Sequence, residues 1–126
     1  MIFDIAIIGA GHAGFEAGMI ATQFGHQVLM FVMPGVSVAS APCNPAIGGV
    51  GKGQVVREID VLGGQMGKLA DKAGIQYRTL NESKGFAVQS TRVQIDKDLY
   101  AQFAEEEVAK NDNLFLRREK VLEITK

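Results

Sequence analysis

Apolar residues near the start of the chain form two short runs separated by a helical pattern. The runs extend from Ile2 to Ile8 and from Val28 to Met33, and each has the nearly unbroken apolar character of a parallel strand buried on both faces. Between them, residues 12–24 have helical spacing, and Gly25 follows at the position of a C-terminal cap. Strand, helix and strand in this order predict a right-handed βαβ unit with parallel strands.

The rest of the chain alternates between irregular and periodic stretches. Residues 37–53 are small, Gly-rich and Pro-rich, which is typical of a loop, and helices are predicted after them up to Gly63 and over 65–72. A helix of roughly four turns ending near Asn111 is marked by an apolar stripe: Ile95, Leu99, Phe103 and Val108. Short strands are predicted at 75–80, 86–88, 114–116 and 121–124. The alternation indicates the α/β class.

Composition narrows the possible functions. The chain has 126 residues, 47% of them hydrophobic and 21% charged, which fits one small globular domain, and we identify no interdomain linker. A formal net charge of −1 gives no global electrostatic reason for nucleic-acid binding. One cysteine and two histidines assemble neither an internal disulfide nor a zinc cluster, so we expect no metal. Neither a signal peptide nor a membrane span is evident, and we expect a cytoplasmic chain.

A glycine box directly follows the first predicted strand. It comprises Gly9, Ala10, Gly11, His12, Ala13 and Gly14. In a dinucleotide-binding fingerprint the first glycine permits the turn, the second lets backbone approach a pyrophosphate, and the third lets the helix pack on the strand. The alternative is a tight turn without a ligand. The acid that usually holds the adenosine ribose is missing, since no carboxylate occurs near Val32. For His12 we expect a cofactor-adjacent or structural role.

Cys43 lies in a second chemically suggestive segment, Pro42–Cys43–Asn44–Pro45. Two prolines stiffen this loop, and a helix carrying Lys52 and Arg57 follows. A helix N-terminus and nearby cations lower the pKa of a thiol and favour the reactive thiolate. A free cysteine is equally often a small buried filler, so the residues alone leave both interpretations open.

Five cations in Gly-rich or turn segments are candidates for phosphate contacts: Lys52, Arg57, Arg78, Lys84 and Arg92. Such side chains bind a cofactor phosphate or an RNA backbone, but each taken singly also fits a solvated surface. The acidic run Glu105–Glu107 is interpreted as a solvated helix face.

Three motifs in order carry a resemblance to a known family. GAGHAG, PCNPAIGGVGKGQVVREID and DKAGIQYRTLNESKG resemble the N-terminus of the glucose-inhibited division protein A family, also called MnmG. The similarity extends over residues 4–121, and the absent acid near Val32 fits it as well. Members are tRNA uridine 5-carboxymethylaminomethyl modification enzymes.

The resemblance implies that residues 1–126 are the N-terminal portion of an FAD-binding, Rossmann-type domain. In the family, NADH reduces the flavin, methylenetetrahydrofolate supplies a one-carbon unit for C5 of the wobble uridine, and a GTPase partner is required. By analogy, Gly9 to Gly14 hold the FAD pyrophosphate and Val121 presents its backbone to the adenine. Cys43 matches the first of two catalytic cysteines, which either adds to C6 of the uracil or acts on a flavin-derived intermediate. Lys84 and Arg92 match family cations and are candidate tRNA contacts with Lys52 and Arg57.

Several departures limit what this chain is expected to do alone. Phe86 and Gln89 replace a proline and an arginine common in the family, and the family's members are several times longer. With the strand order 3-2-1-4-5 the sheet is incomplete, so the first strand becomes an exposed edge and favours self-association. We expect no tRNA modification by this chain alone. The rival interpretations are a nucleotide-binding or interaction module without catalysis and a fragment of another flavin oxidoreductase.

Overall fold

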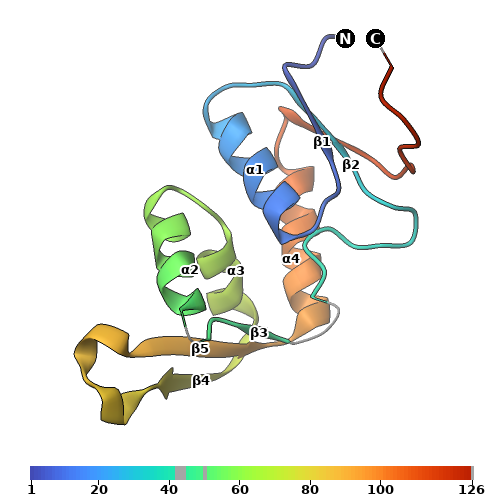
Figure 1. Cartoon of the computed structure of the whole chain (residues 1–126). Coiled ribbons are helices and arrows are strands. Elements are labelled where there is room, and N and C mark those ends of the chain that lie inside the picture. Colours follow the sequence, from blue (N-terminus) through green and yellow to red (C-terminus); the bar gives the residue numbers. More distant parts are fainter. Residues whose placement is uncertain (42–44, 50, 126) are drawn as a thin grey trace. The chain divides into compact units, whose positions relative to one another are not determined.

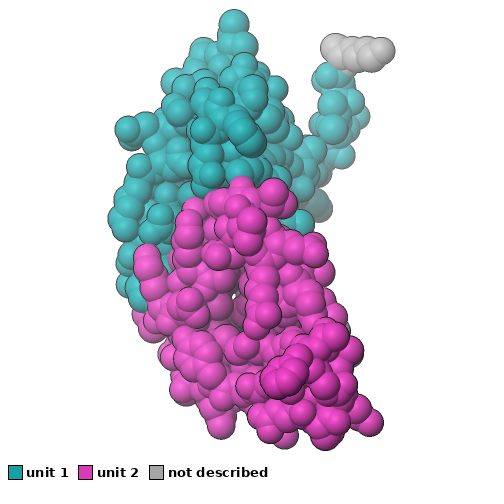
Figure 2. Space-filling view, turned by 90° about the vertical axis from the view of Figure 1, so that its left-hand side faces the viewer, with its two compact units in different colours: residues 1–40, 101–126 teal, residues 41–100 magenta. Residues whose placement is uncertain are grey.

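The computed structural model describes residues 1–41, 45–49 and 51–125, which divide into two compact units (Figure 2). Unit 1 comprises Met1–Ser40 and Ala101–Lys126, and unit 2 comprises Ala41–Tyr100. The chain passes from one unit to the other after Ser40 and again after Tyr100, within helix α4 (Lys97–Ala109). Among the described residues, no helix combines the length and the apolar character required to cross a membrane.

Unit 1 is built on a three-stranded parallel sheet in the order β1-β2-β6 (Figure 1). The strands are β1 (Ile5–Ile8), β2 (Val28–Phe31) and β6 (Leu114–Arg117). Helix α1 (His12–Gln23) connects β1 to β2, which confirms the predicted βαβ unit. The predicted order of these three strands is also confirmed: β2 is central, and β1 forms one edge of the sheet, since within the described residues it pairs with β2 alone.

The core of unit 1 lies around β2. Val28 and Met30 alternate toward the buried side of this strand and are both 0% exposed. A hydrogen bond connects α1 to the segment just before β6: the Asn111 side-chain amide donates to Thr22 Oγ1 at 2.7 Å. The backbone N–H of Val28 donates to the Asn113 carbonyl at 2.8 Å. These bonds fix where β6 enters the sheet.

Unit 2 is an antiparallel sheet accompanied by two helices. The strand order is β3-β5-β4. Its elements are β3 (Ala46–Ile47), α2 (Lys52–Val61), α3 (Met66–Ala73), β4 (Gly74–Leu80) and β5 (Ser90–Ile95), with two 3-10 turns, η1 (Glu82–Lys84) and η2 (Phe86–Val88), between β4 and β5 (Figure 1). In its core, α3 packs on one face of the sheet, and the buried residues include Val93 and Ile95 of β5 and Leu69 and Ala70 of α3.

Two of the predicted strands are wrong. Residues 86–88 form the 3-10 turn η2, because Gly85 adopts a φ of 90° and the Asn81 side chain donates to the Val88 carbonyl at 3.1 Å, which closes a compact loop. Residues 121–124 form no strand, since β6 already pairs with β2 and these residues have no ladder partner within the described part of the chain. Leu122 and Ile124 are accordingly exposed.

The apolar stripe on the fourth helix begins later than predicted. Ile95 belongs to β5, and α4 starts at Lys97 after Asp96. The Asp96 carboxylate accepts the backbone N–H groups of Asp98 and Leu99 at 3.1 and 3.0 Å, which satisfies two donors of the first helical turn. The spacing from Ile95 to Leu99 therefore spans a strand-to-helix junction. The first strand is also shorter than predicted and starts at Ile5.

Candidate functional site

The glycine turn, residues 9–14, joins the carboxyl end of β1 to the start of α1. Gly9 adopts a φ of 104°, a left-handed conformation that favours glycine, and its N–H donates to the Phe31 carbonyl at 2.9 Å. The first intrahelical bond runs from the Phe15 N–H to the Gly11 carbonyl at 2.9 Å. The turn therefore presents the amino end of α1, whose dipole favours anions, at the carboxyl edge of the parallel sheet.

Gly14 and Gly18 permit close packing of α1 on the sheet. A Cβ on Gly14 would overlap the Gly9 carbonyl oxygen and lie 3.3 Å from Ile7 Cγ2. A Cβ on Gly18 would lie 3.0 Å from Leu114 Cδ1, the end of a side chain. The third glycine of the box thus has the packing role that the sequence predicts.

Gly9 and Gly11 face open space instead. A Cβ built on either residue meets no atom of the described chain within 4 Å. Gly11 has φ −68° and ψ −172°, which any residue adopts, so neither backbone conformation nor packing within this chain requires glycine there. The free space lies beside the amino end of α1, where a ligand phosphate would approach backbone.

The other residues of the turn differ in exposure. Ala10 is 4% exposed and its carbonyl accepts the Ala39 N–H at 2.8 Å, whereas Ala13 is exposed. Burial lowers the pKa of the His12 imidazole, and the nearby Glu16 carboxylate partly offsets this effect. His12 is therefore neutral near pH 7 and does not contribute a positive charge to the turn.

The β2 loop, residues 32–40, lies against the glycine turn through the bond between Ala39 and Ala10. Ala39 has a φ of 51° and is fully buried, an uncommon conformation for alanine that the surrounding contacts impose. β2 ends at Phe31, and the sequence has no carboxylate between Phe31 and Val36, the position where a ribose-binding acid usually follows the second strand. Val32 N–H donates to the Arg117 carbonyl at 2.9 Å and continues the β2–β6 pairing.

Glu105 and Arg118 hold the β2 loop from helix α4 and the segment after β6. The Glu105 carboxylate accepts the Val38 N–H at 2.9 Å and the Arg118 guanidinium at 2.7 Å, and Arg118 also donates to the Val36 carbonyl at 3.0 Å. The interpretation of Glu105 as part of a solvated helix face is therefore wrong. The contact between Glu105 and Val38 spans 67 residues of sequence, and no local pattern indicated it.

Glu105→Ala is expected to destabilise the protein by about 1–3 kcal/mol, because the N–H of the fully buried Val38 loses its acceptor. Arg118→Gln is the matched control. This variant removes the ion pair between Arg118, whose side chain is 45% exposed, and Glu105. Its free energy of unfolding is expected to fall by less than about 1 kcal/mol. Urea unfolding followed by circular dichroism measures both. Equal losses in the two variants would contradict the role assigned to the Val38 bond.

Val121, the predicted adenine contact, follows β6 and is half-buried. Because β6 is parallel to β1 and β2, residues after it leave the sheet at the same carboxyl edge as the glycine turn. In open parallel sheets this edge is where ligands bind. The location is compatible with the predicted contact, which stays a prediction.

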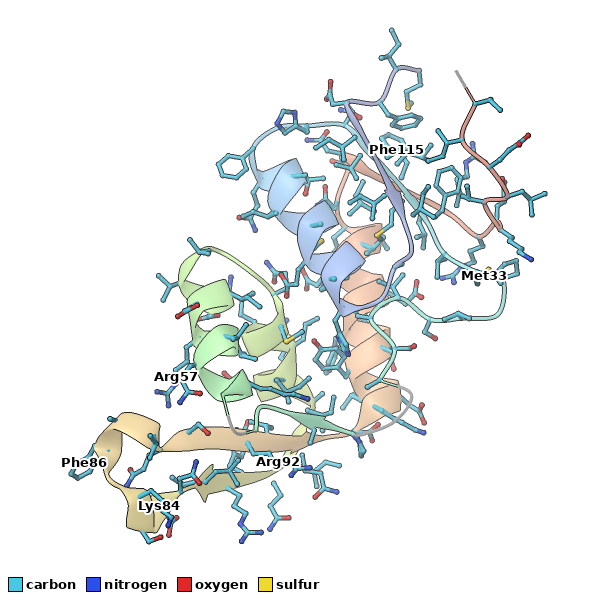
Figure 3. The ribbon with its side chains drawn as sticks, in the orientation of Figure 1. Met33, Arg57, Lys84, Phe86, Arg92 and Phe115 are labelled. Carbon is cyan, nitrogen blue, oxygen red and sulfur yellow. The ribbon has the colours of Figure 1, made fainter. Side chains whose placement is uncertain are left out.

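Cys43 lies outside the described residues. The other predicted residues belong to unit 2. Lys52 and Arg57 are exposed on α2, Lys84 lies in η1, and Arg92 lies on β5. Figure 3 labels Arg57, Lys84 and Arg92. Arg92 stands directly opposite Arg78 on β4, so two of the five candidate cations come together. Arg57 borders a cavity of about 470 Å³ between α2, α3 and the sheet.

Comparison with known proteins identifies the family. The family model described as glucose inhibited division protein A matches residues 4–126. The chain belongs to this family. The resemblance carried by the three sequence motifs is thereby confirmed.

Individual family members agree over nearly the whole chain. The tRNA uridine 5-carboxymethylaminomethyl modification enzyme MnmG of Aquifex aeolicus is 48% identical over 122 residues, which cover 97% of this chain and 20% of that enzyme. The crystal structure of Aquifex aeolicus GidA superposes with a TM-score of 0.95 at 46% identity, over 100% of this chain and 21% of that one. The chain thus spans about a fifth of the length of these relatives.

A more distant structure shows how widely the fold is shared. PqsL, a probable FAD-dependent monooxygenase from Pseudomonas aeruginosa, superposes with a TM-score of 0.57 at 15% identity, over 90% of this chain and 32% of that one. At this identity the likeness concerns the fold alone. Together with the family's own crystal structure it confirms the predicted class, a Rossmann-type α/β fold with a parallel sheet and flanking helices.

Proposed function

We propose that residues 1–126 are the N-terminal portion of the FAD-binding domain of a flavoenzyme that modifies C5 of the tRNA wobble uridine in the cytoplasm. One observation carries this proposal: Gly9 and Gly11 leave the space beside the amino end of α1 empty, in a chain of this family. The name of the Aquifex aeolicus relative supports tRNA modification, and the description of PqsL as a probable FAD-dependent monooxygenase supports FAD.

The glycine turn fits the FAD pyrophosphate. Four backbone N–H groups at the start of an α-helix lack intrahelical partners and donate to anions. A side chain at Gly11 would fill the space that a phosphate needs, and the part of the chain that the structure describes places no atom there. Gly9 to Gly14 would hold the pyrophosphate, the β2 loop would lie beside it, and Val121 would present its backbone to the adenine. When bound, FAD supplies a ring system that accepts a hydride.

The other reactants are proposed from the resemblance of this chain to its family. We propose that NADH supplies the hydride, that methylenetetrahydrofolate supplies the carbon added at C5 of uridine, and that a GTPase partner assists. Cys43 is the proposed nucleophile: addition of its thiolate to C6 of the uracil would shift the C5–C6 electron pair toward C5. Lys52, Arg57, Lys84 and Arg92 are proposed phosphate or tRNA contacts.

A fluorescence titration of FAD into the chain tests the proposed cofactor site. Saturable quenching of flavin fluorescence is expected, together with a rise in the free energy of unfolding as FAD is added, since a ligand that binds the native state alone stabilises it. A folded chain that neither quenches flavin fluorescence nor gains stability would contradict the proposal that these residues suffice to hold FAD.

We also propose that β1 mediates self-association. It is one edge of the sheet, and Ile5 and Ile8 are 36% and 55% exposed. Unpaired backbone beside apolar side chains is a template for pairing with a second chain, and a charge at such an edge prevents it. Light scattering after size exclusion is expected to find a dimer or larger species, and Ile8→Lys is expected to give a monomer. A monomeric parent chain would disprove this.

A further inference from the structure

The outward face of the unit 2 sheet carries a pair of arginines. Arg78 of β4 and Arg92 of β5 are directly opposite in the antiparallel ladder, and Gln76 and Gln94 form the next pair. Residues directly opposite in such a ladder point to the same face. Val93, the neighbour of Arg92, is buried in the core, whereas all four members of these pairs are exposed. We call these four residues the arginine face; Figure 3 labels Arg92 among them.

The positive charges of the arginine face are not neutralised within the described residues. Neither guanidinium forms an ion pair or a side-chain hydrogen bond there, in contrast to Arg118, which binds Glu105 at 2.7 Å. Like charges directly opposite in a sheet repel each other and destabilise the pairing. An anion held between the two guanidiniums would remove this repulsion and accept several charge-assisted hydrogen bonds.

The surface around the pair is hollowed. A cavity of about 300 Å³ is lined by the four residues of the arginine face together with apolar side chains that include Pro45 and Leu80. A second hollow of about 450 Å³ shares Arg78 and Leu80 with the first and continues to Lys84 in η1. Arg78 and Lys84 therefore stand at the two ends of this second hollow, and polar side chains, the Glu82 carboxylate among them, lie between them.

We propose that the arginine face binds the phosphate backbone of RNA. Arg78 and Arg92 hold one phosphate between them, and Lys84 meets another phosphate of the same strand. The extension of positive charge along the hairpin favours a chain of phosphates over a single small anion, because one phosphate would occupy the arginine pair and leave Lys84 unused. The choice of RNA rests on the proposed function, whereas the phosphate site rests on the paired arginines.

The test compares binding of a fluorescein-labelled anticodon stem-loop RNA by anisotropy. In Arg78→Gln/Arg92→Gln, the affinity at about 50 mM salt is expected to fall roughly tenfold, and the slope of log K against log salt is expected to shrink by about 2. Lys68→Gln/Lys110→Gln removes the same charge from exposed positions on α3 and after α4 and is expected to change the affinity less than about twofold.

A charge-conserving variant separates geometry from charge. Arg78→Lys/Arg92→Lys is expected to keep the salt slope while losing part of the affinity, since lysine lacks the planar fork of arginine. Circular dichroism checks folding, and thermal unfolding of the glutamine variant is expected at or above the parent temperature because the repulsion is gone. Equal RNA affinity in the parent and in the folded glutamine variant would overturn the proposal, as would an absence of RNA binding by the parent.

Titrations with NADH and with FAD separate the possible sources of the phosphate. They also separate the failure of the arginine face from the failure of the proposed FAD site. If the glutamine variant loses NADH binding and keeps RNA binding, the arginine pair serves a dinucleotide and the RNA assignment is overturned. FAD titration of the same variant is expected to match the parent. Unchanged FAD binding with unchanged RNA affinity would therefore reject the arginine face and leave the proposed cofactor site standing.

Discussion

Gly14→Ala is expected to destabilise unit 1 severely. The added Cβ would overlap the Gly9 carbonyl oxygen, which is backbone and cannot rotate away. Relief requires either α1 or the glycine turn to move, and movement of α1 breaks its packing against Ile7. Overpacking of this kind costs more than about 3 kcal/mol, a large share of the roughly 5–15 kcal/mol that stabilises a typical domain. Urea unfolding by circular dichroism measures the loss.

Gly18→Ala is the matched control, since it adds the same methyl group one turn further along α1. Its Cβ would meet Leu114 Cδ1 at 3.0 Å, the flexible end of a side chain, and alanine favours the helix by about 1 kcal/mol over glycine. Near-parent stability is expected for this variant. If Gly14→Ala were as stable as Gly18→Ala, the close approach of α1 to the glycine turn would be absent in solution.

Unit 1 could be predicted from the sequence because its signals are local. The glycine box occupies six consecutive residues between an apolar strand and a helix, so the turn, the βαβ unit and the packing role of Gly14 all follow from neighbouring positions. The edge position of β1 follows from the strand order of this fold class. These predictions needed no knowledge of contacts between distant residues.

The predictions that failed depended on contacts between distant segments. β5 was not predicted as a strand because its outward positions, Arg92 and Gln94, are polar and its last residue, Ile95, continues the apolar spacing of α4. The same strand brings Arg92 opposite Arg78, a pairing that the intervening loop and turns conceal in the sequence. Glu105 likewise accepts a hydrogen bond from Val38 in the β2 loop. The helical periodicity around Glu105 carries no information about that distant loop.

Gly11→Val is expected to weaken FAD binding at least about a hundredfold and to leave the fold intact. The backbone of Gly11 is in a region that valine adopts, and its Cβ would meet nothing within 4 Å, so the free energy of unfolding is expected to fall by less than about 1 kcal/mol, the cost of a poorer N-cap. The valine methyl groups would instead occupy the space proposed for the pyrophosphate. Losing two charge-assisted hydrogen bonds of about 1.5–3 kcal/mol each accounts for the expected change in affinity.

Flavin fluorescence titration and urea unfolding of the same preparation separate binding from folding. Ala17→Val is the control, because this exposed residue of α1 lies beyond the glycine turn and receives the same isopropyl group. It is expected to bind FAD as the parent does. Parent-like FAD affinity in a folded Gly11→Val variant would show that the phosphates lie elsewhere. A binding loss without a stability loss would place the cofactor phosphate beside Gly11, where an added Cβ meets no atom of the described residues within 4 Å.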